Sequence, residues 1–182
     1  MPARNTAGRY GFVAQALHWT IVGLLIVQVT LGKIADGMPL GLDKLATLAR
    51  HKSFGITILA LAAIRLAWRA FNRPPPPPPM PRWQLFAAHA NHAALYLLLF
   101  AIPLSGWLMS SATNYPVSWF GLVQLPDLVA PDEALEELFE GVHETLANAL
   151  IVLALLHVAA ALKHQFVDRD RLLYRMLPWR AP

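Results

Sequence analysis

Four long apolar stretches alternate with short polar segments along the chain, and each stretch is long enough to cross a lipid bilayer. A helix needs about 20 apolar residues to span the hydrocarbon core. The pattern predicts membrane-spanning helices over about residues 12–31, 51–68, 86–110 and 142–162. We therefore predict an all-α, integral membrane four-helix bundle that forms a single domain over residues 1–182.

The segments around these spans carry their own signals. Pro74–Pro79 are six consecutive prolines, which cannot be helical and favour an extended polyproline linker. We interpret this linker as a stiff spacer, with a recognition motif for another domain as the alternative. Pro103 lies inside the third span, where neighbouring helices can satisfy the freed backbone groups. The fourth helix is expected to begin before its apolar stretch, near Pro131 and Asp132, as a polar extension.

Composition supports a membrane protein. Hydrophobic residues make up 56% of the chain and charged residues 14%, against roughly 25% charged in an average soluble domain. The formal net charge is +4, but Lys and Arg flank the apolar stretches, which favours a membrane surface over nucleic acid as the partner. The chain has no cysteine, which excludes thiolate metal sites, iron–sulfur clusters and covalent haem attachment.

The distribution of Lys and Arg predicts the orientation of the bundle. Three segments, at the two termini and around the proline linker, carry arginine: Arg4, Arg9, Arg69, Arg73, Arg82, Arg169, Arg171, Arg175 and Arg180. The segment between the third and fourth spans has no Lys or Arg and instead carries Asp127, Asp132, Glu133, Glu136, Glu137 and Glu140. Both termini are therefore predicted to be cytoplasmic.

The histidines are the candidate chemistry, because histidine within a membrane span is costly and usually functional. With the predicted orientation, His51 and His143 lie near the outer surface. The other five lie toward the inner surface: His18, His89, His92, His157 and His164. The histidines therefore fall at two depths.

The spacing of the histidines predicts two ligand pairs. His143 and His157 are 14 residues apart, which is about 21 Å along a helix and about 40° around it. Depth then pairs His51 with His143 and His18 with His157. Imidazole is a good iron ligand, and two imidazoles fill both axial positions of a haem, which favours electron transfer over oxygen binding. We predict that these four histidines are the metal ligands of two haem b groups.

Other interpretations stay open for single residues. Any one of these histidines could be a polar contact between helices. His92 could be a third inner ligand, a hydrogen-bond partner of a propionate or quinone, or a packing contact. Arg65 lies at the inner level, where it could pair with a haem propionate or snorkel to the surface. His89 is expected at the interface, and His164, beyond the hydrocarbon core, is not expected to be a ligand.

The chain resembles the prokaryotic cytochrome b561 family at an ordered set of motifs over nearly its whole length. They are Leu17-His18-Trp19, His51-Lys52-Ser53-Phe54-Gly55 with Arg65-Leu66, His89-x-x-His92-x-x-x-Tyr96, Pro103-Leu104-Ser105-Gly106, His143-Glu144-Thr145-Leu146-Ala147-Asn148, and His157. The resemblance implies four helices and two bis-histidine haems, with the pairing that depth gives independently. It also implies the inner (cytoplasmic) membrane of a bacterium.

The family includes a superoxide oxidase that passes electrons to ubiquinone. We therefore predict a superoxide:ubiquinone oxidoreductase, in which a small anionic donor reduces the outer haem, the inner haem is reduced in turn, and ubiquinone accepts the electrons. Two alternatives remain. One is a haem b anchor subunit that takes electrons from a partner dehydrogenase or hydrogenase. The other is a non-redox transporter whose histidines bind a metal ion.

The segment between the first two spans is an exception to the charge rule. Although predicted to be external, it carries four cations against two acids: Lys33, Lys44, Arg50 and Lys52, with Asp36 and Asp43. Arg50 and Lys52 flank His51. They could anchor to lipid headgroups, pair with the acidic segment before the fourth span, or form an anion funnel over the outer haem that steers superoxide.

Overall fold

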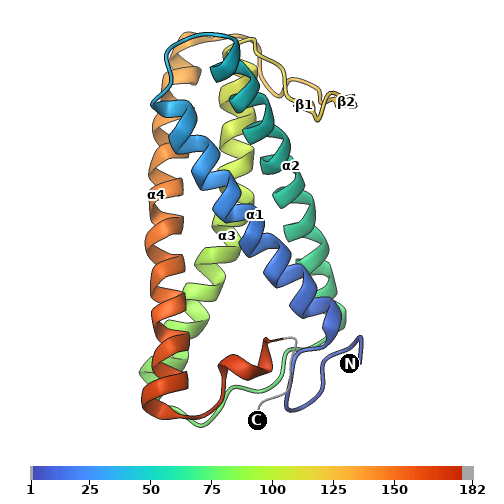
Figure 1. Cartoon of the computed structure of the whole chain (residues 1–182), viewed down its shortest axis with the longest axis vertical. Helices are drawn as coiled ribbons and strands as arrows, with labels where there is room; N and C mark the ends of the chain where they lie inside the picture. Colours follow the sequence, from blue (N-terminus) through green and yellow to red (C-terminus); the bar gives the residue numbers. More distant parts are fainter. Residues whose placement is uncertain (1, 178–182) are drawn as a thin grey trace.

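The computed structural model describes residues 2–177 and consists of four long helices that run alternately up and down (Figure 1). They are α1 (Phe12–Asp36), α2 (Leu42–Phe71), α3 (Arg82–Ala112) and α4 (Glu133–Lys163). All four are long and apolar enough to cross a membrane. The predicted all-α transmembrane bundle is therefore confirmed.

The helices extend beyond the apolar stretches. α2 begins at Leu42, about two and a half turns before His51, because Asp43, Lys44 and Arg50 interrupt the apolar pattern of this stretch without ending the helix. α4 begins at Glu133, and its N-cap Asp132 accepts a hydrogen bond from the Leu135 amide at 2.9 Å. A capping carboxylate favours the start of a helix, which explains the predicted polar extension.

The bundle is built from two helix hairpins. α1 packs along α2 and α3 packs along α4, while α2 and α3 share a smaller contact. α4 does not pack closely along α1 or α2. Small residues allow the close approaches: a Cβ on Gly55 of α2 would lie 3.3 Å from Gln28 Nε2 of α1, and small residues are typical of helix contacts in membranes. Side chains of α4 therefore face α1 and α2 across the centre of the bundle.

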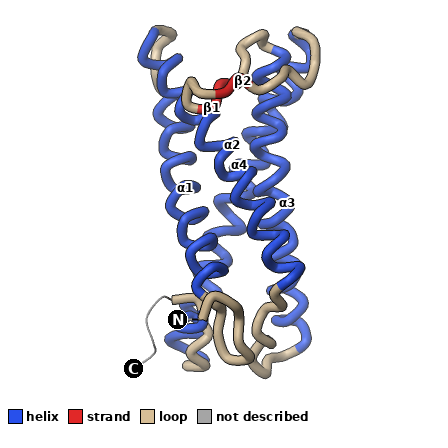
Figure 2. Tube along the Cα trace, turned by 90° about the vertical axis from the view of Figure 1, so that its right-hand side faces the viewer, coloured by secondary structure: helices blue, strands red, loops and turns tan. Residues whose placement is uncertain are grey.

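A short β-hairpin lies beside α2 at one end of the bundle (Figures 1 and 2). Its strands β1 (Ser118–Trp119) and β2 (Val123–Gln124) are antiparallel. Ser53 of α2 donates a hydrogen bond to the Ser118 carbonyl at 3.1 Å and accepts one from the Phe120 amide at 2.9 Å. The Trp119 indole donates to the Thr57 hydroxyl at 3.0 Å. These bonds fix the α3–α4 connection against α2.

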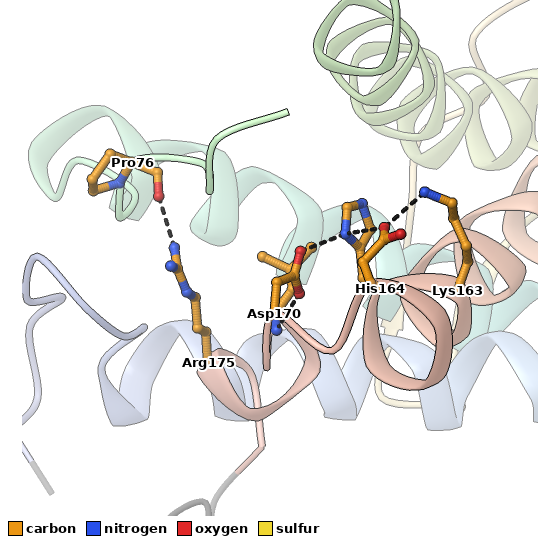
Figure 3. A network of polar contacts seen from close by, with 7 residues as sticks. Pro76, Lys163, His164, Asp170 and Arg175 are labelled. Atoms are coloured by element: carbon orange, nitrogen blue, oxygen red, sulfur yellow. Dashed lines mark hydrogen bonds and ion pairs between the residues drawn. The ribbon is translucent and has the colours of Figure 1, made fainter. Parts of the chain in front are cut away.

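Three segments meet at the opposite end of the bundle. The chain after α4 forms a π-helical turn, η1 (His164–Asp168), and a short 3-10 helix, η2 (Leu173–Arg175). The Arg175 carbonyl accepts from the Tyr10 amide at 3.1 Å, and the Arg175 guanidinium donates to the Pro76 carbonyl at 2.7 Å, as Figure 3 shows. The N-terminal segment, the non-helical proline linker and the C-terminal arm thus share one end, as the arginine distribution predicts. Arg180 lies outside the described residues.

This arrangement generates a topology prediction. Reporters fused after the last residue or inserted within Pro74–Pro79 should both read cytoplasmic, because the charge rule places these arginine-rich segments inside. A reporter near Asp127 should read external. Paired fusions to alkaline phosphatase and green fluorescent protein measure the side at each position. A cytoplasmic signal near Asp127 would invert the assignment of outer and inner histidines.

Candidate functional site

The structure brings the predicted histidine pairs together across the bundle. His51 of α2 faces His143 of α4 with ring centroids 6.1 Å apart. His18 of α1 faces His157 of α4 with centroids 6.4 Å apart. A metal held between two imidazole nitrogens at about 2.0–2.1 Å from each separates the ring centres by roughly 6 Å. The spacing of both pairs therefore suits a metal ligated by both rings.

The two outer histidines are each anchored through Nδ1. His51 Nδ1 lies 3.2 Å from the Gln28 carbonyl of α1, and His143 Nδ1 lies 3.0 Å from the Ile102 carbonyl of α3. A carbonyl can only accept, so Nδ1 carries the proton in each ring. The Nε2 lone pair is then available to a metal, which is the arrangement that carbonyl partners impose on ligating histidines. The hydroxyl of Ser105 lies 3.2 Å from His143 Nδ1 as a second partner.

A glycine follows each of these carbonyls by four residues, one helical turn later. A Cβ on Gly32 of α1 would lie 3.3 Å from His51 Cε1, and a Cβ on Gly106 of α3 would lie 3.0 Å from His143 Cε1. The missing side chains let the imidazoles lie directly against the neighbouring helix. Each helix hairpin thus holds an outer histidine in what we call a carbonyl–glycine notch.

The notches were not predicted from the sequence. Gly106 belongs to a motif that carries the family resemblance, and Gly32 closes the first apolar stretch. The only signal was a glycine inside an apolar helix, which indicates a close approach of some kind but does not name its partner.

The inner pair has charged and polar surroundings. Arg65 of α2 donates from Nε to the Tyr96 hydroxyl at 3.0 Å and from Nη1 to the Ala14 carbonyl at 3.2 Å. Ala14 is one helical turn before His18 on α1. Within residues 2–177, Arg65 forms no ion pair with an acidic side chain. The structure therefore places Arg65 at the level of the inner pair, as the sequence predicts.

His92 of α3 joins the inner histidines but differs from them. Its ring centroid lies 5.2 Å from that of His157, closer than the roughly 6 Å expected for two imidazoles on one metal. The residue is also exposed, as is His89 one turn earlier. These features favour a contact of His92 with His157 over a shared metal.

His164 lies outside both pairs, in the polar network after α4 (Figure 3). Its Nδ1 lies 2.6 Å from an Asp170 carboxylate oxygen and 3.2 Å from one of Asp168. Three such groups are close enough to hold a metal ion. The Lys163 ammonium bonds Asp168 at 2.7 Å and already neutralises that carboxylate. The network therefore serves to fold the C-terminal arm.

The outer cations occupy two different environments. The Lys52 ammonium donates to the Tyr115 carbonyl at 3.0 Å and lies 3.9 Å from the centre of the Tyr115 ring. Arg50 is exposed. Within residues 2–177, no ion pair joins either of them to the acids that begin α4. Pairing with that acidic segment is therefore not observed.

Comparison with known proteins identifies the family of the chain. Residues 9–179 match the family model of prokaryotic cytochrome b561. The chain is 38% identical to "Cytochrome b561 homolog 2" of Escherichia coli over 97% of its own length and 95% of the relative. It is 32% identical to "Cytochrome b561 homolog 1" of the same organism, over 90% of this chain and 94% of the relative. It is 28% identical to "Probable superoxide oxidase CybB" of Yersinia pestis, over 93% of this chain and 96% of the relative.

The family match covers all four helices and every histidine discussed above. The family resemblance deduced from the sequence motifs is thereby confirmed. With four helices able to cross a membrane, the chain is a multi-pass bacterial membrane protein. It belongs to the prokaryotic cytochrome b561 family, whose members transfer electrons in the membrane and carry haem b.

Proposed function

We propose that this protein is a superoxide:ubiquinone oxidoreductase of the bacterial inner membrane, with two haem b groups held by His51/His143 and His18/His157. The observation that carries this proposal is the pair of facing imidazoles at each of two levels of one bundle, with centroids 6.1 and 6.4 Å apart. The separation suits bis-histidine ligation at both levels.

α4 supports this assignment because it contributes one ligand to each pair. The face of α4 that carries both histidines also carries Ala147, Leu150 and Ala154, and none of these five residues is exposed. The steps between them alternate between four and three residues, which keeps them on one side of a helix. The two alanines leave room beside the ligands for a flat macrocycle.

The residues define what such a site can do. Haem b, when bound, supplies a one-electron iron couple. Two histidines per iron leave no open position for oxygen to bind, so the protein restricts the site to electron transfer. The Nδ1 bonds to the Gln28 and Ile102 carbonyls fix the outer rings and raise their basicity as ligands. Membership in a cytochrome family supports this redox role over the metal transporter.

The proposed substrates balance the reaction. Two superoxide anions each lose one electron and leave as dioxygen, while ubiquinone gains two electrons and two protons to form ubiquinol. Superoxide is suggested by the name of the Yersinia pestis relative and by the exposed cation Arg50 at the outer end. The inner pair, on the side of the termini, is the proposed side of quinone reduction.

The histidine pairs predict which variants share a phenotype. The wild-type protein should contain two low-spin haems per chain by pyridine haemochrome assay. His51→Ala and His143→Ala should lose one and the same haem, and His18→Ala and His157→Ala the other, because each variant removes an axial ligand. His92→Ala should retain both haems. Loss of a haem in His92→Ala together with retention in His157→Ala would contradict the inner pairing.

The carbonyl–glycine notch predicts an effect without loss of a ligand. Gly106→Ala should displace the His143 ring, because the new Cβ would lie 3.0 Å from it. Outer-shell changes at metal sites typically weaken binding roughly 10- to 100-fold, and we expect such a loss in retention of the outer haem during dilution. Gly32→Ala should have a smaller effect, since its contact is 3.3 Å.

Gly23→Ala is the matched control, because nothing lies within 4 Å of its Cβ position. Alanine favours helix over glycine by up to about 1 kcal/mol, so none of the three variants should destabilise the helices themselves. Equal haem retention in Gly106→Ala and Gly23→Ala would show that the notch does not position His143.

The outer cations predict electrostatic steering of an anionic donor. The double substitution of Arg50 and Lys52 by Gln should slow reduction by superoxide in rapid mixing. Steering raises association rates by roughly 10- to 1000-fold, and the variant should lose part of that gain. The haem spectrum should not change. The wild-type rate should also fall with salt, because the Debye length shrinks from about 10 Å at 0.1 M to about 3 Å at 1 M.

Arg50→Gln alone separates charge from structure, because Lys52 also holds Tyr115. The control is Arg82→Gln, which removes an exposed cation at the opposite end of the bundle. A salt-independent rate that is also equal in all these variants would argue against an anionic donor at this end.

A further inference from the structure

A cleft at the inner end of the bundle stands apart from the histidine pairs. It opens between the start of α1, the last turns of α2 and the Tyr96 side of α3, and its enclosed part is small, about 20 Å³, enough for one ligand oxygen to enter from the open side. Arg65, Trp68, Arg69 and Asn72 line it from α2 and its C-cap. These four polar or amphipathic residues lie on one face at the end of the helix and thus converge on one space.

The buried polar atoms of this lining that lack a partner are hydrogen-bond donors. Trp68 Nε1 and Asn72 Nδ2 are both buried without an acceptor, and Asn72 is only 8% exposed. The Asn72 amide is oriented by its other atom, because Oδ1 accepts from the Asn5 backbone amide at 3.3 Å. The amino group of Asn72 must therefore face away from that bond. Unpaired buried donors are rare in folded proteins, which indicates an acceptor that belongs in the cleft.

The cleft also holds uncompensated positive charge. Arg65 and Arg69 lie 5.9 and 5.8 Å from the centre of the same Tyr96 ring. In the described part of the chain neither guanidinium forms an ion pair with Asp or Glu. Two cations beside two free donors would be satisfied by a group with negative charge and several acceptor oxygens. A neutral carbonyl would accept from the donors but leave the charge unbalanced.

We infer that this cleft is an oxyanion site, in which Trp68 Nε1 and Asn72 Nδ2 donate to a carboxylate or phosphate oxygen and Arg65 and Arg69 balance its charge. Two sources share this chemistry. One is a propionate of the inner haem, a source that rests on the proposed function. Arg65 is near that level, because it donates to the Ala14 carbonyl one turn from His18. The other is the phosphate of an anionic phospholipid, because basic pockets between membrane helices bind such headgroups.

Three variants test the site on the full-length protein. Trp68→Phe removes one donor and keeps an aromatic ring, Asn72→Asp replaces the other donor with a negative oxygen, and Arg69→Gln removes the exposed cation at the rim. Trp83→Phe and Arg73→Gln are the matched controls, because neither residue lines the cleft. The probes are phosphatidylglycerol and phosphatidylcholine, with binding measured by native mass spectrometry. The midpoint potential of the inner haem is measured on the same samples.

The two sources give different results. If the site holds a lipid phosphate, the wild type prefers phosphatidylglycerol, and each variant weakens that binding by roughly 10- to 100-fold, the effect of losing a hydrogen bond to a charged group. The midpoint potential then stays unchanged in Trp68→Phe, the variant that alters no formal charge. If the site holds a propionate, phosphatidylglycerol binding is equal in all samples. The midpoint potential of the inner haem instead falls in Trp68→Phe as well as in the two charge variants, because a less compensated carboxylate favours oxidised iron.

The inference is wrong if Trp68→Phe matches its control Trp83→Phe in both measurements. Failure of the proposed function is a separate result, recognised by a wild-type protein that contains no haem at either level. In that case the comparison of the two lipids still tests the oxyanion site. A variant-dependent preference for phosphatidylglycerol supports the oxyanion site, and its absence overturns it.

Discussion

The structure depends on one constraint, which is that polar groups inside a membrane must find their partners within the protein. The outer histidines meet it through Nδ1 bonds to the Gln28 and Ile102 carbonyls, and these bonds determine much of the surrounding packing. An imidazole reaches the side of a neighbouring helix only where that helix lacks a side chain, so a glycine must lie beside each ring. Both bonds lie within the closely packed pairs, α1 with α2 and α3 with α4. The polar connections are confined to the two ends, where water and headgroups are available.

The carbonyl–glycine notch occurs once in each helix hairpin. In both, the first helix supplies a carbonyl and a glycine one turn apart, and the second helix supplies the histidine. The two histidines then face each other with their Nδ1 atoms directed outward to the helices that hold them. This leaves Nε2 of each ring for the space between, where the ring separation of 6.1 Å suits a metal. The bundle needs no loop to position its outer ligands, because rigid helices do so. In the β-hairpin, by contrast, the contacts of Ser53 and Thr57 serve to close the end of the bundle.

The sequence predicted the features that depend on periodicity and missed those that depend on contact. Hydropathy gave the four spans, and helical geometry aligned His143 with His157 because that argument needs only positions along one helix. The early start of α2 was missed because Asp43, Lys44 and Arg50 interrupt the apolar pattern before His51, and a helical turn that carries charges does not count toward a membrane span in hydropathy. The carbonyl partners of the histidines were missed because a backbone carbonyl has no sequence signature. The cleft at the end of α2 was missed for a related reason. Trp68 and Asn72 have no unusual spacing, and their free donors are recognised only when the surrounding acceptors are counted.

The two levels of the bundle differ in a way that bears on the direction of electron transfer. The outer histidines donate to neutral carbonyls, but the cations Arg50 and Lys52 flank His51. The inner histidines lie near Arg65, which has no acidic partner in the described residues. Positive charge stabilises the reduced form of a nearby haem, because reduction removes one positive charge from the iron. On the proposed ligation, cations would therefore raise the potential at both levels, and an oxyanion beside Arg65 would lower it at the inner level. The free-energy change of electron transfer between the two levels would depend on this balance. The group that occupies the inner cleft would set the size of that change, so the occupant of the cleft and the driving force of the reaction are linked.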